Sequence, residues 1–165
     1  MAFLQGASDR PHLYHTSITV GTDGDGYEDT FFPVWWWGAT SSWGHRRIII
    51  SRAYSAAGPT SHGTHKAGLQ FEAVCGNNDW GGHPHTFTVT HYSYTYRHTV
   101  ANAGGTAHNM KNYVLLRAGG YTYNITTEGF EPSLTIGNHT TNQQTYTGTT
   151  LDATTTTSLS TKAYE

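Results

Sequence analysis

Histidine supplies the first candidate chemistry in this chain. There are 11 His among 165 residues, and neutral imidazole is a common metal ligand. His83 and His85 flank Pro84, so on a strand both rings would share one face, and three chains around an axis would combine six nitrogens. The same residues suit a polar turn, as does the Gly-containing loop with His62 and His65. Because no ladder of further His-x-His pairs follows, we expect polar turns and no metal.

Acidic residues raise two further hypotheses. Four of them punctuate the Gly-rich segment 21–29, where their oxygens could bind calcium: Asp23, Asp25, Glu28 and Asp29. The match to a complete calcium loop is poor, and a solvated hairpin turn explains the same residues. Glu72 and Asp79 could form the carboxylate pair of a glycosidase, but nothing in the sequence sets their separation. Ser51 and Ser61 lack a nucleophile-elbow motif, so we predict that the protein is not an enzyme.

Aromatic residues support a binding function better than a catalytic one. Exposed Trp and Tyr rings stack on sugar faces, while Asn, Asp and His side chains bond sugar hydroxyls. The candidate ligand-binding residues are Trp43, Tyr54, Asp79, Trp80, His83, His85, Tyr92, Tyr94 and Tyr96. The alternative is that these rings lie in the core or at a subunit interface, which is the commoner fate of an aromatic stripe.

Residues 69–100 are predicted to form a hairpin, and most of the candidate ligand-binding residues lie in it. Apolar and polar residues alternate in 69–75 and again in 86–90, the period of a strand with one buried face. The Asn, Asp, Gly and Pro residues between them are typical of a turn, and Trp80 stands in its middle. After Tyr92 the pattern shifts by one residue, which indicates a β-bulge or a strand break. Cys75 falls on the apolar face and is predicted to be buried.

The other periodic segments are also predicted strands, and no window has a helical period. They cover residues 13–20, 30–38, 45–53, 112–117, 121–126 and 133–136, whereas 101–111 is predicted to be a polar loop. About seven or eight short strands favour an all-β fold, an antiparallel and jelly-roll-like β-sandwich. Trp35, Trp36 and Trp37 are consecutive and must point to both faces of their strand. Because one face then needs cover outside the primary core, we expect these rings at an oligomer interface.

Composition excludes several functional classes. Only 12% of residues are charged and the net charge is −2, whereas a nucleic-acid binder is distinctly basic. No apolar run approaches the roughly 20 residues that span a bilayer, and the N-terminus lacks a signal-peptide pattern. A single Cys excludes an internal disulfide framework. We therefore expect no nucleic-acid partner, no membrane insertion and no cofactor.

Four segments of the chain stand out as a series: Phe31-Phe32-Pro33-Val34 before a Trp-rich strand, residues 45–52, Asp79-Trp80-Gly81-Gly82-His83-Pro84, and residues 112–123. In this order they resemble segments of a widespread domain of bacteriophage tail fibres. The corresponding family pieces are a Tyr-Pro-Val strand, a strand ending Thr-Ile-Ser-Arg, a Gly-Trp-Gly-Gly-(His/Asn)-Pro turn and a Val-Trp-Leu-Arg-Gly-Gly-Thr-Tyr-Tyr strand pair. The resemblance covers roughly residues 25–130, with Leu115 where Trp is usual and Ala118 in place of the first Gly.

The resemblance implies a trimeric, β-rich virion adhesin or fibre-associated domain, and it supplies no receptor or catalytic residue. We divide the chain into an N-terminal arm with the first strand (1–24), an adhesin-like β-sandwich (25–137) and a Thr/Asn-rich extended tail (138–165). The implied function is host attachment as a tail-fibre or receptor-binding domain in the virion. Its partners would be two further copies of the chain, other virion proteins, and a host-surface glycan or outer-membrane receptor.

Two other hypotheses stay open. The small size favours a structural virion part of the same fold, such as a capsid decoration or tail-connector protein. The third hypothesis is a fragment of a polysaccharide-degrading tailspike.

Replacing Trp80 with Ala tests the attachment hypothesis at the level of the sequence. Because Trp80 lies between Asp79 and Gly81 in a predicted exposed turn, Trp80→Ala should lower the rate of host adsorption and leave the thermal melting temperature unchanged. An unchanged adsorption rate, or a collapse of thermal stability, would contradict this assignment.

Overall fold

The computed structural model describes residues 12–24, 26, 27, 29–37, 45–56, 67–76, 87–105, 111–137 and 162–164. These segments contain ten strands: β1 (Leu13–Val20), β2 (Phe31–Trp37), β3 (His45–Arg52), β4 (Gly68–Gly76), β5 (Phe87–Thr95), β6 (Val100–Gly105), β7 (Lys111–Arg117), β8 (Tyr121–Glu128), β9 (Leu134–Ile136) and β10 (Lys162–Tyr164). None of the described segments forms a helix able to cross a bilayer.

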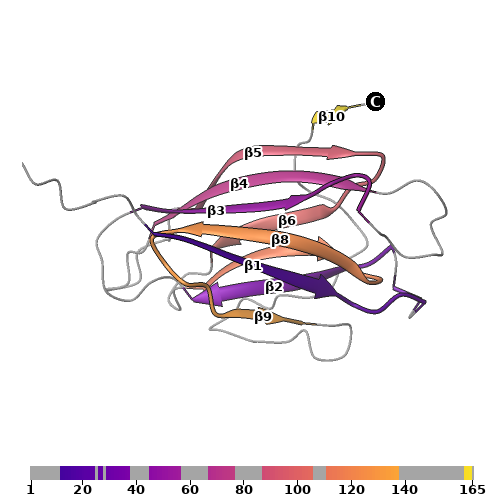
Figure 1. Ribbon diagram of the computed structural model, residues 1–165, viewed down its shortest axis with the longest axis horizontal. Helices are drawn as coiled ribbons and strands as arrows, with labels where there is room; N and C mark the ends of the chain where they lie inside the picture. The colour runs from indigo at the N-terminus through magenta and orange to yellow at the C-terminus, as the bar shows by residue number, and fades with distance from the viewer. Residues whose placement is uncertain are drawn as a thin grey trace, which may run out of the picture.

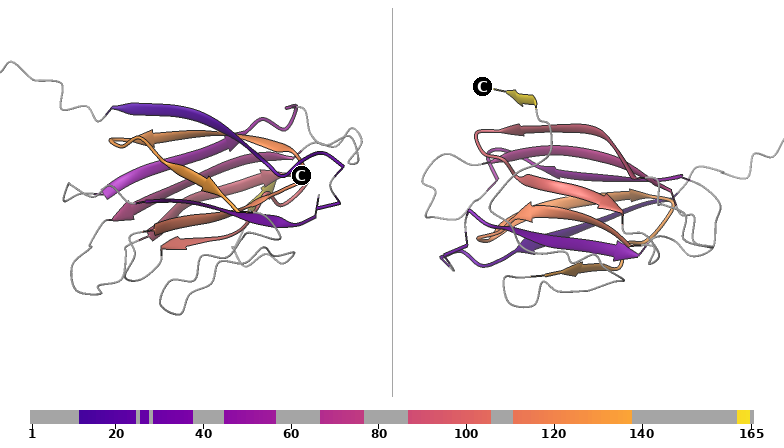
Figure 2. Two further views of the ribbon diagram at one scale, coloured as in Figure 1. Left: turned by 90° about the horizontal axis from the view of Figure 1, so that it is seen from below. Right: turned by 180° about the vertical axis from the view of Figure 1, so that it is seen from behind.

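The strands form two sheets, and the fold is all-β and β-sandwich-like, as predicted. The order is β1-β8-β3-β4-β5-β10 in the six-stranded sheet and β6-β7-β2-β9 in the four-stranded sheet. Neighbours are antiparallel except β10, which runs parallel to β5. Figure 1 shows the six-stranded sheet with β10 above β5 and β1 toward the bottom. The right panel of Figure 2 shows the four-stranded sheet from the other side.

Most strand predictions are confirmed, and the error lies at residues 101–111. That segment was expected to be a loop, but Val100–Gly105 forms β6 and pairs with β7. Ala, Asn and Gly have low strand propensity, so the sequence of β6 carries no strand signal of its own. Val100 and Ala101 are fully buried, which shows that tertiary packing decides the conformation. The strand count was also too low, because β6 and β10 were not foreseen.

Alternating apolar residues of both sheets fill the core. In β8, Tyr121, Tyr123 and Ile125 point inward and alternate with exposed Thr122 and Asn124. Cys75 is also buried, as predicted, and burial raises the pKa of its thiol to about 12. The alternation that predicted these strands therefore also identifies most of the residues between the sheets.

The irregularity predicted after Tyr92 is a β-bulge, and it lies slightly earlier in the strand, at Thr90. Glu72 pairs with His91, but the next residue, Ala73, pairs with Val89, so Thr90 is the extra residue. The insertion reverses the face of the following residues. Phe87 and Val89 point inward before the bulge, and Tyr92 and Tyr94 point inward after it.

Burial of the Trp run within one chain corrects part of the oligomer-interface prediction. Trp36 is 0% exposed and packs with Phe32 and Val34 between the sheets. Trp35 alternates with Trp36 onto the other face of β2, yet it is only 4% exposed. The reasoning that one of these rings needs cover from another subunit is therefore wrong for Trp35 and Trp36. The side chain of Trp37 lies outside the described residues.

A buried arginine ties three segments together at one end of the six-stranded sheet. Arg52 is 4% exposed, and its guanidinium donates to the carbonyl oxygens of Ala67 (3.0 Å), Thr122 (2.8 Å) and Ala56 (3.0 Å). It lies 4.8 Å from the centroid of the Tyr121 ring. Burial lowers the pKa of Arg52 from its usual value, yet a guanidinium stays charged in proteins.

Loss of Arg52 should be far more damaging than loss of an exposed arginine. Arg52→Met leaves three carbonyl oxygens without this donor, and we expect the free energy of unfolding to fall by about 3 kcal/mol or more. Urea denaturation measures this difference. The matched control is Arg47→Met on the same strand, where a 2.6 Å ion pair with Glu72 is exposed to solvent and should contribute about 1 kcal/mol or less. Equal losses in the two variants would contradict the assigned role of Arg52.

Candidate functional site: an aromatic pocket at the end of β3, β4 and β5

A surface cavity of about 370 Å³ opens where β3 ends and β4 begins. Its lining is mostly uncharged: Arg52, Ala53, Tyr54, Gly68, Leu69, Gln70, Ser93, Tyr94 and Thr95. Gly68 pairs with Thr95 and Gln70 pairs with Ser93, so these residues form adjacent rows across β4 and β5. The pocket thus combines hydroxyl, amide and aromatic groups, the set that fits a polyhydroxylated ligand.

Two exposed tyrosines stand together beside this cavity. Tyr54 and Tyr96 are 58% and 60% exposed, and their ring centroids lie 6.2 Å apart with the planes tilted by 51°. Tyr96 adopts a left-handed backbone conformation with φ at 66°, which is rare for a bulky residue, and residues in such conformations cluster at functional sites. Large exposed rings held in such a position are suited to stacking against a ligand.

The turn that carries Tyr96 is fixed by a second tyrosine. The Tyr94 hydroxyl is hydrogen bonded to His98 Nε2 at 2.8 Å, and the two ring centroids are 4.0 Å apart. Burial, reinforced by the positive charge of Arg117, lowers the pKa of His98, so the imidazole is neutral near neutral pH. In the unfolded chain His98 has the ordinary histidine pKa of about 6.5 and therefore takes up a proton at a higher pH than in the folded protein. Protonation of His98 thus favours the unfolded chain, and the folded protein loses stability as the pH falls below about 6.5.

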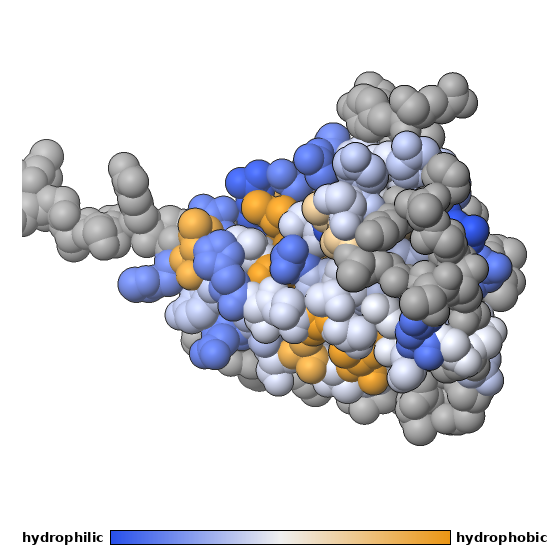
Figure 3. Space-filling view, turned by 45° about the vertical axis from the view of Figure 1, so that its right-hand side comes forward, coloured by the Kyte–Doolittle hydropathy of each residue, from blue (hydrophilic) through white to orange (hydrophobic). Residues whose placement is uncertain are grey.

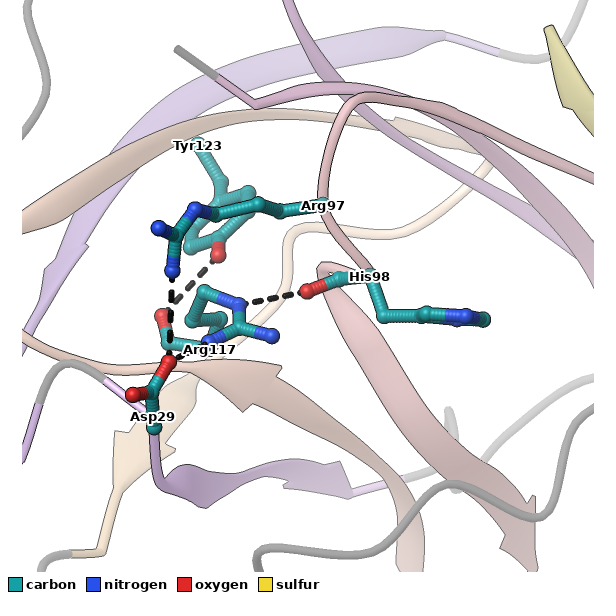
Figure 4. Close-up of polar contacts among 5 residues, drawn as sticks. All are labelled: Asp29, Arg97, His98, Arg117 and Tyr123. Carbon is teal, nitrogen blue, oxygen red and sulfur yellow. Dashed lines mark hydrogen bonds and ion pairs between the residues drawn. The ribbon is translucent and has the colours of Figure 1, made fainter. Parts of the chain in front are cut away.

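Arg117 anchors the same turn to the four-stranded sheet (Figure 4). Its Nε donates to the His98 carbonyl oxygen at 2.5 Å, and its Nη1 donates to Asp29 Oδ1 at 2.8 Å. Arg97 reaches the same Asp29 oxygen at 3.3 Å. Tyr123, from the core, donates to the Arg117 carbonyl oxygen at 2.9 Å. These contacts hold residues 96–99 from both sides and therefore restrict the position of Tyr96.

Three of the predicted ligand-binding residues come together at this pocket. Tyr54 precedes Tyr94 and Tyr96 by about 40 residues in the sequence. The pairing of β3 with β4 and of β4 with β5 nevertheless places all three at one end of the sheet. Tyr92 is a correction: it is 8% exposed, and its hydroxyl donates to the Val100 carbonyl oxygen at 3.0 Å. Trp43, Asp79, Trp80, His83 and His85 lie outside the described residues, as do His62 and His65.

Sequence reasoning missed the polar half of the pocket. The sequence assigns Gln70 and Ser93 only to strands; in the structure they pair on the outer face of the sheet, where Gln70 is exposed and Ser93 is 4% exposed. The sequence signal for these residues is the predicted irregularity near Tyr92, because the bulge at Thr90 sends Ser93 and Thr95 to the same face as Gln70. Arg52 gave no such signal, since a charged residue at the end of a strand is ordinarily solvated.

The acidic and histidine clusters provide no metal site in the described part of the chain. There, no group of three or more His, Cys, Asp or Glu side chains is placed to hold a metal ion. Asp29, one of the candidate calcium ligands, accepts from Arg97 and Arg117 instead. Glu72, the candidate glycosidase acid, is ion-paired with Arg47.

Comparison of this chain with models of known protein families, with curated proteins and with solved structures finds no match.

Gly68 is predicted to set the position of Tyr54. A Cβ added at Gly68 would lie 3.1 Å from Tyr54 Cβ, 3.2 Å from Tyr54 N and 3.3 Å from Thr95 Oγ1, so Gly68→Ala should displace Tyr54 and increase its separation from Tyr96. Weaker NOEs between the two rings would report the shift. Gly104→Ala is the control, because its Cβ would crowd only the Tyr113 ring, at 3.1 Å from the hydroxyl. Unchanged Tyr54–Tyr96 NOEs in Gly68→Ala would contradict the prediction.

Proposed function

We propose that this protein is a non-enzymatic virion protein of a bacteriophage that contributes to host attachment by binding a surface glycan at the Tyr54–Tyr96 pocket. The observation that carries the proposal is the exposed tyrosine pair beside a cavity lined by hydroxyl and amide groups. The all-β, β-sandwich-like fold is compatible with the tail-fibre resemblance of residues 25–130. Assembly as a homotrimer, which the resemblance implies, and a jelly-roll connectivity, which the strand pattern suggested, remain predictions.

Binding is favoured over catalysis by the groups that line the pocket. Glycoside hydrolysis ordinarily needs two carboxyl groups flanking the scissile bond. The described pocket lining includes neither Asp nor Glu. Cys75, a nucleophile by residue type, is 3% exposed and its thiol is protonated at neutral pH. These features support an adhesive role and weigh against the tailspike-depolymerase alternative.

One observation favours the structural alternative, a capsid decoration or tail-connector protein. The outer edge of β5 accepts Lys162–Tyr164 as a parallel strand, in register with Ser93–Thr95. An edge that accepts an added strand can also join chains in an assembly. This role concerns the sheet edge and is compatible with glycan binding at the aromatic pair.

The proposal is tested by removing each exposed ring. Tyr54→Ala and Tyr96→Ala should each weaken glycan binding about fivefold or more, because each removes roughly 1 kcal/mol of ring contact. A glycan array and a host-adsorption competition assay with the purified chain measure the effect. Tyr14→Ala, which removes a tyrosine 36% exposed on β1, should change neither readout. If no glycan on the array is bound, or the host polysaccharide is cleaved, the proposed function is wrong.

A further inference from the structure

One row of side chains crosses the outer face of the six-stranded sheet and leads into the aromatic pocket. Direct cross-strand pairs join its members in the order Ser17, Asn124, Ser51, Gln70 and Ser93. We call these five residues the polar row. Directly paired residues in a ladder share one face, and the residues next to them on β3, β4, β5 and β8 lie on the opposite, core side of the sheet. With strands about 4.8 Å apart, the polar row is about 19 Å long.

The polar row has unused hydrogen-bonding capacity. Ser17, Asn124 and Gln70 are exposed and Ser51 is half-buried, and these four side chains make no hydrogen bond to the described residues of the protein. The adjacent positions of this face on β1 and β8 differ, because their side chains are hydrogen bonded to one another. Thr19 bonds Thr122 at 2.8 Å, and His15 bonds Thr126 at 2.9 Å. Four of the five side chains of the polar row therefore present donors and acceptors to solvent or a ligand, whereas Ser93 is 4% exposed and its hydroxyl is hydrogen bonded to His91 Nε2 at 3.1 Å.

The charges on and near the polar row indicate whether its ligand is neutral or charged. None of its five residues is ionisable, and the nearest charged pair on this face, Arg47 and Glu72, is mutually neutralised at 2.6 Å. Arg52, which lines the pocket, is engaged by three carbonyl oxygens. Among the side chains that the structure describes on the row, none therefore offers a cation to an anionic ligand; the side chain of Lys162, which pairs with Ser93 at the pocket end, lies outside the described residues. The described surface in Figure 3 is mostly near-white and blue, with apolar residues in small separate patches, unlike the apolar centre of a protein interface.

We propose that the ligand is a neutral, linear oligosaccharide that lies along the polar row with one end in the Tyr54–Tyr96 pocket. This inference rests on the proposed function and adds the charge, the length and the direction of the bound glycan. Ser hydroxyls and Asn or Gln amides both donate and accept, as sugar hydroxyls do. Gln70 and Ser93 belong both to the row and to the pocket lining, so the two surfaces are continuous.

The inference predicts that affinity depends on glycan length. The probes are neutral malto-, cello-, chito- and manno-oligosaccharide ladders from two to six units, with sialylated and uronic-acid oligosaccharides as anionic comparisons, titrated into the full chain by calorimetry. Hexasaccharides of a bound neutral ladder should bind about tenfold more tightly than disaccharides, because the longer chain reaches the far end of the row.

The double variant Ser17→Ala/Asn124→Ala removes the end of the row farthest from the pocket. It should lower hexasaccharide affinity about tenfold and leave disaccharide affinity unchanged, whereas Tyr54→Ala should weaken both. Thr88→Ala, exposed on the same face but two registers from the row, should change neither. Thermal melts of all variants check that the fold is intact.

The possible outcomes separate the two proposals. Glycan binding without length dependence, a preference for the anionic oligosaccharides, or a hexasaccharide affinity unaffected by Ser17→Ala/Asn124→Ala would overturn the polar-row inference while the proposed function stands. Absence of binding to every probe would overturn both.

Discussion

The pocket depends on one buried guanidinium. Arg52 binds carbonyl oxygens of Ala56, Ala67 and Thr122, and thereby joins the end of β3, the approach to β4 and the start of β8. An uncompensated charge would be costly at this depth, so the three carbonyl oxygens and the Tyr121 ring must converge on it. This convergence fixes Ala53 and Tyr54 relative to Gly68. The position of the exposed Tyr54 ring is therefore determined from inside the protein.

Arg117 fixes the position of the other exposed ring, that of Tyr96. It binds the His98 carbonyl oxygen and Asp29 and receives a hydrogen bond at its own carbonyl from Tyr123. The turn at residues 96–99 is held by these contacts, and Tyr96 takes a strained backbone conformation at its start. Strain of this kind persists only where the surroundings enforce it. Arg52 and Arg117 are both buried, whereas Tyr54 and Tyr96 are exposed. The two arginines thus preorganise the tyrosine pair, one from each side of the site.

Much of the sheet structure could be predicted from the sequence because strand alternation carries it directly. The hairpin of β4 and β5, its bulge and the inward Tyr121–Tyr123–Ile125 face follow from a two-residue period. β6 could not be predicted, since Ala, Asn and Gly become a strand only through pairing with β7. The oligomer-interface prediction for Trp35 and Trp36 also failed because it depended on tertiary packing. Alternation places the two rings on opposite faces of the strand, but it does not show that one chain buries both. For the site, residue type suggested Tyr54, Tyr94 and Tyr96, whereas their convergence required the sheet order.

The central claim is that the Tyr54–Tyr96 pair is a preorganised glycan-binding surface, and an NMR titration tests it most directly. The full chain with ¹³C-labelled tyrosine rings is titrated with neutral hexasaccharides. The account predicts that the ring signals of Tyr54 and Tyr96 shift in a saturable way, while the signals of buried Tyr92 and Tyr123 stay in place. Saturable shifts confined to other tyrosines, or hydrolysis of the sugar during the titration, would contradict it.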